Sequence, residues 1–376
     1  MIKFWSYNRE LKKYKKKINS KINKSLNSGQ IFFGNELSNF EKKFIKKNRS
    51  KYGVAVGSGT DALFIALKSL GIKKGDEVIT AANTAIPTIS AIRSTGASPK
   101  LVDIGNDYLI DPLKIEKEIT NRTKIIIPVH LYGQTCEMEK IIKIAKKYKI
   151  KIVEDCAQSQ GAKYKNRFCG TIGELGCFSF YPTKILGAYG DGGFILTNDY
   201  NLYKKIKRIR FYGIETVDKK NKYFNKYYSN EDGINSRLDE IQAGILNFKL
   251  SIIEKLIARR RHLASLYFKE LISTELKLPI IRKYSDHVFH LFTIYHPRRD
   301  EIVKKLKELS IETKIIYPYP IHKMNAFKKI FKNNKRLKNS EVKSKGIFCL
   351  PIYPELKDKE AIRVCKSIKR ILAKIA

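Results

Sequence analysis

One lysine, Lys184, stands between two apolar runs in a setting that could lower the pKa of its ammonium group. The first run is Gly176-Cys-Phe-Ser-Phe, and a glycine-dense turn after the lysine leads into Gly193-Phe-Ile-Leu-Thr. A strand, a turn and a second strand would place the ammonium at the edge of a sheet, partly withdrawn from water. Desolvation disfavours the charged form of a lysine, and a neutral amine can attack a carbonyl to form a Schiff base. Lys184 is therefore a candidate for covalent chemistry.

A glycine-containing segment, Val56-Gly-Ser-Gly-Thr-Asp-Ala-Leu63, follows an expected strand and opens an expected helix. Gly57 and Gly59 allow the backbone to approach a ligand closely, and the free N–H groups at a helix start can bind phosphate. An ordinary strand-to-helix turn capped by Ser58 or Thr60 is the alternative interpretation.

An acidic pair, Glu154 and Asp155, ends the apolar run that begins at Ile152. Ligands of α/β sheets bind at the carboxyl ends of strands, and a buried carboxylate there needs a cationic partner. A protonated pyridine nitrogen would serve, although the acid could instead cap the next helix. A phosphate cradle, an acid for a ring nitrogen and a Schiff-base lysine are what pyridoxal 5'-phosphate requires. The chain carries them in that order.

The elements that would position these residues alternate between strand and helix from residue 52 to residue 155. The apolar runs are nearly continuous in Ile and Val, which is typical of strands buried on both faces of a mostly parallel sheet. We therefore predict an α/β fold of the doubly wound type. The expected strands cover residues 52–56, 77–80, 100–104, 124–129 and 151–155, and the expected helices cover residues 60–70, 86–95, 112–119 and 137–148.

The pattern changes after residue 200. The sequence predicts one long helical region over residues 236–271, a strand at 288–295, a helix at 300–309, a strand at 314–317 and a helix at 358–375. We expect residues 1–250 to form an N-terminal segment with a large cofactor-binding α/β domain. We expect residues 251–376 to form a smaller C-terminal α+β domain.

Composition limits the classes of function. The chain of 376 residues has 75 Lys plus Arg against 36 Asp plus Glu, a formal net charge of +39. The lysines are spread along the whole chain without a nucleic-acid-binding motif. A biased amino-acid usage that favours Lys, together with attraction for a dianionic substrate, therefore explains the charge better than DNA or RNA binding. We find no apolar run long enough to span a membrane and no signal-peptide core.

The cysteines and histidines indicate neither disulfides nor a metal centre. The six cysteines show no zinc-like spacing, which favours reduced thiols in a cytoplasmic protein. His287 and His290 lie in an expected strand and would point to opposite faces, so no metal site is predicted.

Several ordered motifs resemble the DegT/DnrJ family of fold-type I, pyridoxal-phosphate-dependent sugar aminotransferases, and the resemblance covers nearly the whole chain. The fold implied is a large, mostly parallel α/β domain like that of aspartate aminotransferase, with a smaller C-terminal domain. The matching segments are Ser58-Gly-Thr-Asp-Ala-Leu63, Ala82-Asn-Thr-Ala-Ile-Pro-Thr88, Pro128-Val-His-Leu-Tyr-Gly-Gln134, Glu154-Asp-Cys-Ala-Gln158, Phe178-Ser-Phe-Tyr-Pro-Thr-Lys184, Gly190-Asp-Gly-Gly193, Asn235-Ser-Arg-Leu-Asp-Glu-Ile-Gln242 and Leu350-Pro-Ile-Tyr-Pro354.

The resemblance implies a role for each matching residue. Lys184 would carry the covalent imine with the cofactor and move protons, and Asp155 would pair with the pyridinium nitrogen. Gln158 would lie beside the phenolic oxygen of the ring. Gly59, Thr60 and Ser179 would bind the phosphate, and Asn235 would reach it across the interface of a homodimer with shared active sites. Tyr317 and His322 match a region that contacts the nucleotide sugar.

The implied reaction is amino transfer from L-glutamate, through the pyridoxamine 5'-phosphate form of the cofactor, to a nucleotide-linked keto-sugar. The motifs are most similar to those of relatives that aminate C-3 of a dTDP-linked 3-keto-6-deoxyhexose, and the products of such enzymes enter lipopolysaccharide and other glycans. Amination at C-4, a UDP-linked sugar and a non-catalytic cofactor-binding regulator remain alternatives. A sugar dehydratase of the same fold would carry histidine in place of Lys184.

The chain departs from the family pattern at Ala85. Many relatives carry an aromatic residue there that stacks on the cofactor ring. We expect stacking to be weaker or to come from another side chain, such as Ile86.

Overall fold

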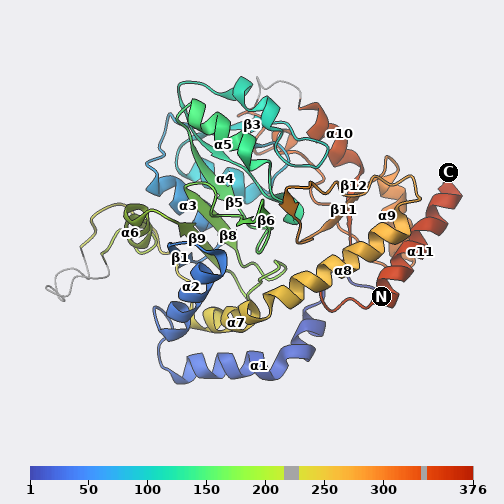
Figure 1. Ribbon diagram of the computed structural model, residues 1–376, viewed down its shortest axis with the longest axis horizontal. Helices are drawn as coiled ribbons and strands as arrows, with labels where there is room; N and C mark the ends of the chain where they lie inside the picture. Colours follow the sequence, from blue (N-terminus) through green and yellow to red (C-terminus); the bar gives the residue numbers. More distant parts are fainter. Residues whose placement is uncertain (216–227, 332–336, 376) are drawn as a thin grey trace.

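The computed structural model describes residues 1–215, 228–331 and 337–375 (Figure 1). A seven-stranded sheet forms its centre, in the order β1-β9-β8-β5-β4-β2-β3. Four pairs of neighbours in this sheet are parallel, and β9 is antiparallel to both β1 and β8. The strands are β1 (Tyr52–Val56), β2 (Glu77–Ala81), β3 (Ser98–Val102), β4 (Thr123–Ile127), β5 (Lys151–Asp155), β8 (Leu175–Ser179) and β9 (Gly193–Thr197).

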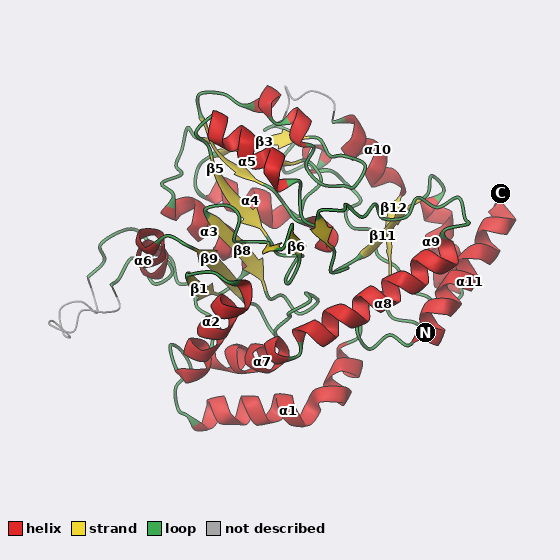
Figure 2. Ribbon diagram, viewed as in Figure 1, coloured by secondary structure: helices red, strands yellow, loops and turns green. Residues whose placement is uncertain are grey.

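Helices enclose the sheet (Figure 2). Three begin at side-chain caps, where Ser58, Asp199 and Asp239 accept backbone N–H groups of the first turn. The α-helices are α1 (Tyr7–Asn27), α2 (Asn35–Asn48), α3 (Gly59–Ser69), α4 (Ile86–Ser94), α5 (Met138–Lys147), α6 (Tyr200–Ile209), α7 (Glu240–Ser251), α8 (Ile253–Leu271), α9 (Arg299–Glu308), α10 (Lys338–Gly346) and α11 (Asp358–Ile375).

Short strands complete the fold. They are β6 (Lys163–Tyr164), β7 (Arg167–Phe168) and β10 (Ser285–Asp286), which form one small sheet, and β11 (Phe292–Tyr295) and β12 (Ile347–Leu350), which form another. The long helix α8 leads from the region of the large sheet to α9 and α11, beside the N-terminus (Figure 1).

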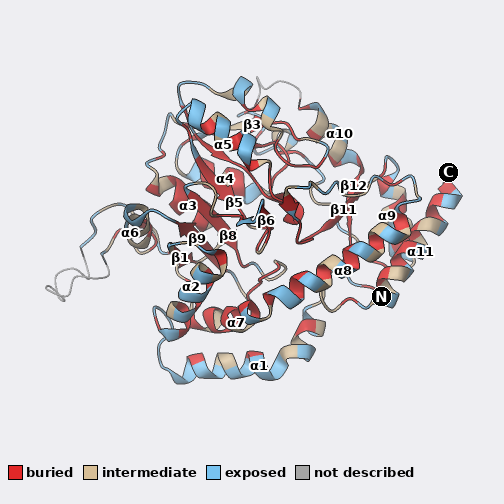
Figure 3. Ribbon diagram, in the orientation of Figure 1, coloured by how far each residue is buried: buried red, intermediate tan, exposed pale blue. Residues whose placement is uncertain are grey.

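The sheet is buried because its strands are almost wholly apolar. Every residue of β2, β8 and β9 is buried, whereas the outer face of α1 is exposed (Figure 3). One core cluster lies around the sheet, and a second joins α8, α9 and α11 to β11 and β12. The first cluster also includes residues beyond 250, among them Leu291, Ile321 and Cys349, so the division at residue 250 stays a proposal. No helix in the described ranges is both long and apolar enough to cross a bilayer.

The α/β prediction is confirmed, and β1, β5 and α11 have the predicted bounds. The prediction of an α-helix at residues 112–119 is wrong, because the segment forms two 3-10 turns, Pro112–Lys114 and Glu116–Glu118, that contain no buried residue. Only Ile115, between the two turns, is buried, and a helix with so narrow a buried face gains little from packing. The predicted strand at residues 314–317 is reduced to one bridge between Lys314 and Cys349.

Two other predicted elements are shorter than expected. The long helical region breaks at Ile252 (φ −115°), because α7 packs against α1 and α2 whereas α8 packs against α11. The strand predicted from residue 288 begins only at Phe292, since Phe289 has a positive φ of 49° that an extended strand does not allow. His287 and His290 therefore lie outside the strand.

Candidate active site

Four neighbouring strands bring the chemical groups of the chain to one edge of the sheet. Gly57 follows the end of β1, Ser179 ends β8 and Asp155 ends β5. The antiparallel strand β9 begins at the same edge with Gly193, which pairs with Val56 and with Ser179. Lys184 lies in the loop between β8 and β9, as the sequence predicts.

A cavity of about 300 Å³ opens at this edge. Seven of the nine predicted site residues line it: Gly59, Thr60, Asp155, Gln158, Ser179, Lys184 and Tyr317. They come from segments far apart in the sequence, so the fold creates the cluster. Asn235 and His322 are absent from its lining.

The N-terminus of α3 forms one wall of the cavity. The Ser58 side chain accepts the Asp61 N–H at 3.0 Å, and no bond among the described residues uses the N–H groups of Gly59 and Thr60. A Cβ on Gly59 would lie 2.6 Å from the Ser179 Cβ, so only glycine allows this approach. Free N–H groups, the positive end of the helix dipole and nearby hydroxyls suit a phosphate.

The Lys184 ammonium lies deep in the protein but faces the cavity. Burial lowers its pKa from 10.5 to about 8, although the Asp155 charge opposes this shift. No hydrogen bond or ion pair within the described ranges engages its Nζ atom at hydrogen-bond distance. A substantial neutral fraction is therefore present near pH 8, which is the form that attacks a carbonyl.

The Asp155 carboxylate is buried and held on both oxygens. Its Oδ1 atom accepts the Ala157 N–H at 3.1 Å, and its Oδ2 atom accepts the Thr88 hydroxyl at 2.9 Å. Burial raises the pKa of Asp155, whereas these two donors and the positive charge of Lys184 oppose the rise. Such a carboxylate can retain a proton on a cationic nitrogen beside it.

Gln158 connects two parts of the cavity wall. Its Oε1 atom accepts the Tyr132 N–H at 2.8 Å, and its Nε2 atom donates to the Tyr317 hydroxyl at 3.0 Å. An amide nitrogen has two protons, so one remains for a ring oxygen in the cavity. Tyr317 thus lies at the cavity and also positions Gln158.

The two predicted residues outside the cavity lining have other surroundings. Asn235 is exposed and bridges to Phe211, next to Ser236, whose hydroxyl accepts the Gly57 N–H at 2.8 Å. The side chain of His322 is nearly buried, and its Nε2 atom lies 3.1 Å from Glu341. Neither side chain reaches the cavity of its own chain.

The wall near Ala85 is aliphatic. Ala85 and Pro87 line the cavity, together with Val129 and Leu131. Ile86, which we expected to replace the missing aromatic ring, is 49% exposed and does not contribute to the lining.

Sequence analysis assigned no role to three polar residues of the lining. Tyr181 and Asp191 lie in the loop that carries Lys184, and Thr88 contacts Asp155. The contact of Thr88 joins the start of α4 to the end of β5, 67 positions along the chain, so no local pattern indicates it.

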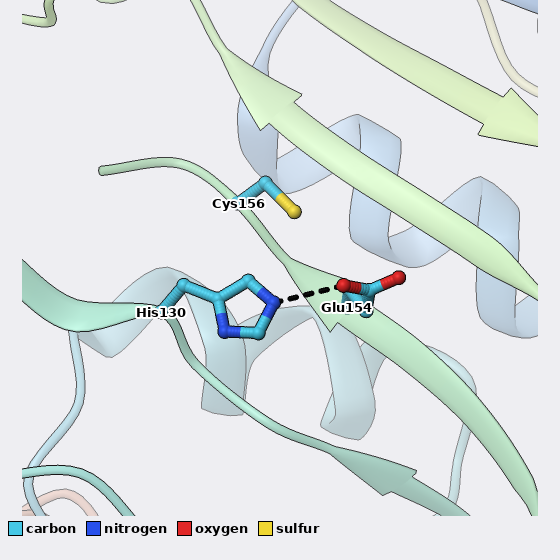
Figure 4. Close-up of side chains that lie close together, drawn as sticks. All are labelled: His130, Glu154 and Cys156. Atoms are coloured by element: carbon cyan, nitrogen blue, oxygen red, sulfur yellow. Dashed lines mark hydrogen bonds and ion pairs between the residues drawn. The ribbon is translucent and has the colours of Figure 1, made fainter. Parts of the chain in front are cut away.

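His130 lies close to Glu154 and Cys156, the two residues that flank Asp155 in the sequence, and the three side chains are of types that can bind a metal (Figure 4). The His130 Nδ1 atom accepts the Cys136 N–H, so its Nε2 atom donates to Glu154 at 2.9 Å. Both ring nitrogens are therefore occupied. Glu154 also accepts three backbone N–H groups, from Gly170, Ile172 and Gly173. We assign this cluster to the support of β5.

We expect Glu154→Gln to lower the free energy of unfolding by about 3 kcal/mol, because it leaves buried donors unpaired. Burial acts to raise the pKa of Glu154, but the opposite effect of His130 and the backbone donors is larger in total. The pKa of Glu154 therefore lies below its ordinary value. The carboxylate thus stabilises the fold above the unfolded pKa of about 4.3, and this contribution is lost as the pH falls. Urea unfolding at pH 7 and pH 4 measures both effects.

Glu116→Gln is the matched control, since Glu116 forms an exposed ion pair with Lys147. Its unfolding curve should coincide with that of the unmodified protein. Equal stability of the Glu154→Gln protein at pH 7 would contradict a structural role for the cluster.

Comparison with known proteins assigns the family. The sequence model of the DegT/DnrJ/EryC1/StrS aminotransferase family matches residues 12–369. The chain belongs to this family. It is a sugar aminotransferase by family, and the cofactor of DegT/DnrJ aminotransferases is pyridoxal phosphate.

Relatives in the DegT/DnrJ family include transaminases and a regulator. The chain is 39% identical to dTDP-3-amino-3,4,6-trideoxy-alpha-D-glucose transaminase of Micromonospora megalomicea, over 98% of each chain. It is 41% identical to dTDP-3-amino-3,6-dideoxy-alpha-D-galactopyranose transaminase of Aneurinibacillus thermoaerophilus, over 98% of this chain and 99% of the relative. A pleiotropic regulatory protein of Geobacillus stearothermophilus is 39% identical over 92% of each.

Solved structures of the DegT/DnrJ family share the fold. DesV from S. venezuelae, in complex with a ketimine intermediate, matches with a TM-score of 0.93 at 36% identity and 98% coverage of both chains. NtdA from Bacillus subtilis, with bound PMP, matches with a TM-score of 0.89 at 30% identity, over 98% of this chain and 83% of that one.

Proposed function

We propose that this aminotransferase transfers the amino group of L-glutamate to C-3 of a dTDP-linked 3-keto-6-deoxyhexose. The observation that carries the proposal is the meeting of Lys184, Asp155 and the N-terminus of α3 in one cavity. Relatives that share about two-fifths of the sequence are named for dTDP-3-amino-sugars, which supports this substrate class.

Each residue of the cavity has a definite task in the proposal. When bound, pyridoxal phosphate supplies an aldehyde that exchanges amines and a cationic ring that accepts electrons. Asp155 retains the proton on the ring nitrogen, and Gln158 donates to the ring oxygen. Gly59, Thr60 and Ser179 bind the phosphate. Lys184 holds the cofactor and then moves a proton at its Nζ atom, which its lowered pKa favours.

The aliphatic wall at Ala85 and Pro87 gives the ring less aromatic contact than the usual family residue would. We keep Tyr317, which lines the cavity, and His322 as residues that contact the nucleotide sugar. The six cysteines are unpaired and buried, which supports a reducing compartment such as the cytoplasm.

A panel of dTDP- and UDP-linked 3-keto- and 4-keto-sugars tests the proposal. The protein is incubated with glutamate and each sugar, 2-oxoglutarate is measured, and the product is characterised by mass spectrometry and NMR. We expect turnover with the dTDP-3-keto-sugars and a new C–N bond at C-3. Amination only at C-4, or only of UDP-sugars, would contradict the substrate assignment.

A non-catalytic regulator is the alternative, favoured by the similarity to a pleiotropic regulatory protein. Such a protein would bind pyridoxal phosphate but form no 2-oxoglutarate with any sugar of the panel. The lowered pKa of Lys184 suits both, because holding the cofactor as an imine also needs a neutral amine. Formation of 2-oxoglutarate with a keto-sugar therefore decides between them.

We also propose that the enzyme is a homodimer in which Asn235 completes the phosphate site of the partner. Asn235 is exposed beside the α3 cradle, and the same region presents Ile31, Phe32 and Phe33, each about two-fifths exposed. The Arg237 guanidinium lies 4.2 Å from the centre of the Phe32 ring. An apolar patch of this kind next to a binding site suits an interface between copies.

Asn235→Ala is expected to raise the Kd for pyridoxal phosphate about tenfold, since it removes a hydrogen bond to a charged group. Titration of the cofactor absorbance measures this change. Mixing Asn235→Ala with Lys184→Ala subunits, at a cofactor concentration near the Kd of the unmodified protein so that Asn235→Ala sites are mostly empty, then tests the sharing. If Asn235 acts across the interface, about a quarter of the sites in the mixture are intact, and activity returns. Activity that stays at the level of the separate variants would refute a shared site.

A further inference from the structure

Two threonines in the first turn of α4 and just before it form a chain of hydrogen bonds that ends on Asp155. The Thr88 Oγ1 atom lies 2.9 Å from the Asp155 Oδ2 atom and 2.9 Å from the Thr84 Oγ1 atom. Both threonines are 1% exposed. Thr88 also lines the cavity, so the chain ends where the cofactor would bind.

The direction of donation follows from the chemistry of the groups. An ionised carboxylate can only accept, so the Thr88 hydroxyl must donate its single proton to Asp155. The Thr84 hydroxyl must then donate to Thr88. The two hydroxyl protons therefore have a single assignment of donor and acceptor, in which Thr84 donates to Thr88 and Thr88 donates to Asp155.

We propose that Thr88 is a positioning residue whose hydroxyl, oriented by Thr84, keeps the Asp155 carboxylate ionised and turned toward the cavity. The inference rests on the proposed function, because it assigns Asp155 to the ring nitrogen. With Ala157 on Oδ1 and Thr88 on Oδ2, the carboxylate cannot rotate without losing a bond. About two of its four acceptor positions remain for a ring N–H.

The surroundings of Asp155 explain why such a donor is needed. Burial raises the pKa of Asp155, and the Thr88 hydroxyl is among the groups that lower it. A protonated Asp155 could not keep a ring nitrogen cationic. Glu154 precedes Asp155 in the sequence. The other titratable groups that interact electrostatically with Asp155 are Lys184, His130, Tyr317, Cys136, Cys156 and Cys177.

The experiment compares Thr88→Val, Thr88→Ser and Thr84→Val. Valine keeps the shape of threonine without the hydroxyl, and serine keeps the hydroxyl. Cofactor-free protein is labelled with ¹³C at the aspartate carboxyl groups, and the Asp155 resonance is the one missing from Asp155→Asn. Its chemical shift is followed against pH.

We expect Thr88→Val to raise the Asp155 titration midpoint by about one pH unit, the size of a lost hydrogen bond to a charge. Thr84→Val should give a smaller rise, and Thr88→Ser should stay within about 0.3 unit of the unmodified protein. A midpoint for Thr88→Val within that same range would overturn the proposal. If Thr88→Val does not fold, the absence of any rise in Thr84→Val would overturn it.

A second measurement separates this inference from the proposed function. Since Asp155 acts ionised, the acid limb of the kcat profile should move to higher pH by the same amount in Thr88→Val. If the carboxyl midpoint rises but the acid limb stays, Thr88 still positions Asp155 and the catalytic role proposed for Asp155 fails.

Discussion

Lys184→Ala is expected to abolish the yellow, borohydride-reducible chromophore that forms with pyridoxal phosphate, and to lower kcat by a factor of about 10⁴ or more. Among the described residues that line the cavity, Lys184 is the only amine, and burial lowers its pKa to about 8. Removing it eliminates both the covalent attachment and the group that moves the proton. The absorbance of the yellow chromophore measures the loss of attachment, and glutamate turnover measures the loss of catalysis.

Lys343→Ala is the matched control for this prediction. Burial lowers the pKa of Lys343 too, but its side chain does not line the cavity. This variant should keep the chromophore and most of the turnover. A reducible chromophore that persists in Lys184→Ala would show that another lysine holds the cofactor.

The pH dependence of chromophore formation gives a further check of Lys184. The neutral amine is the reactive form, and it predominates above the pKa. The rate of formation in cofactor-free protein should therefore rise with pH around a midpoint near 8, well below the value of an exposed lysine. A midpoint above 10 would mean that burial does not activate this amine.

Asp155→Asn should lower kcat by a factor of about 10³ or more and weaken retention of the cofactor. An amide has no charge to hold a proton on the ring nitrogen, and a neutral pyridine is a poor electron acceptor. The chromophore should still form when cofactor is in excess, because Lys184 remains. Measurements of kcat and of the Kd for pyridoxal phosphate separate these effects.

Asp300→Asn is the control, since the Asp300 side chain on α9 is 80% exposed. It should leave kcat and the Kd for pyridoxal phosphate unchanged. Near-normal turnover in Asp155→Asn would contradict the role of Asp155 at the ring nitrogen. If circular dichroism shows that Asp155→Asn is unfolded as well as inactive, the role of Asp155 is to stabilise the fold.

The parts of the fold that the sequence predicts well are those that local pattern controls. Strand β5 is indicated by the apolar residues Ile152 and Val153, and the polar residues that follow Asp155 indicate where it ends. The cap at Ser58 and the glycines around it indicate where α3 begins. For the same reason Lys184, Asp155 and Gly59 could be recognised as one functional set before their distances were known.

The parts that could not be predicted depend on contacts distant in the sequence. The break at Ile252 follows from the different partners of α7 and α8, and the positive φ of Phe289 follows from the packing around it. The threonine chain to Asp155 joins the start of α4 to the end of β5. The separation of Asn235 from the cavity of its own chain likewise has no local signal.

The insertion of β9 between β1 and β8 has a consequence for how this chain can vary. The distances among the phosphate cradle at Gly59, Lys184 and Asp155 depend on the number of strands between them, because neighbouring strands lie about 4.8 Å apart. They do not depend on the lengths of the connections. Extra residues in a remote surface turn, such as that between β6 and β7, would leave these distances unchanged. A single residue added inside β8 would shift Ser179 and Lys184 against both neighbours at once.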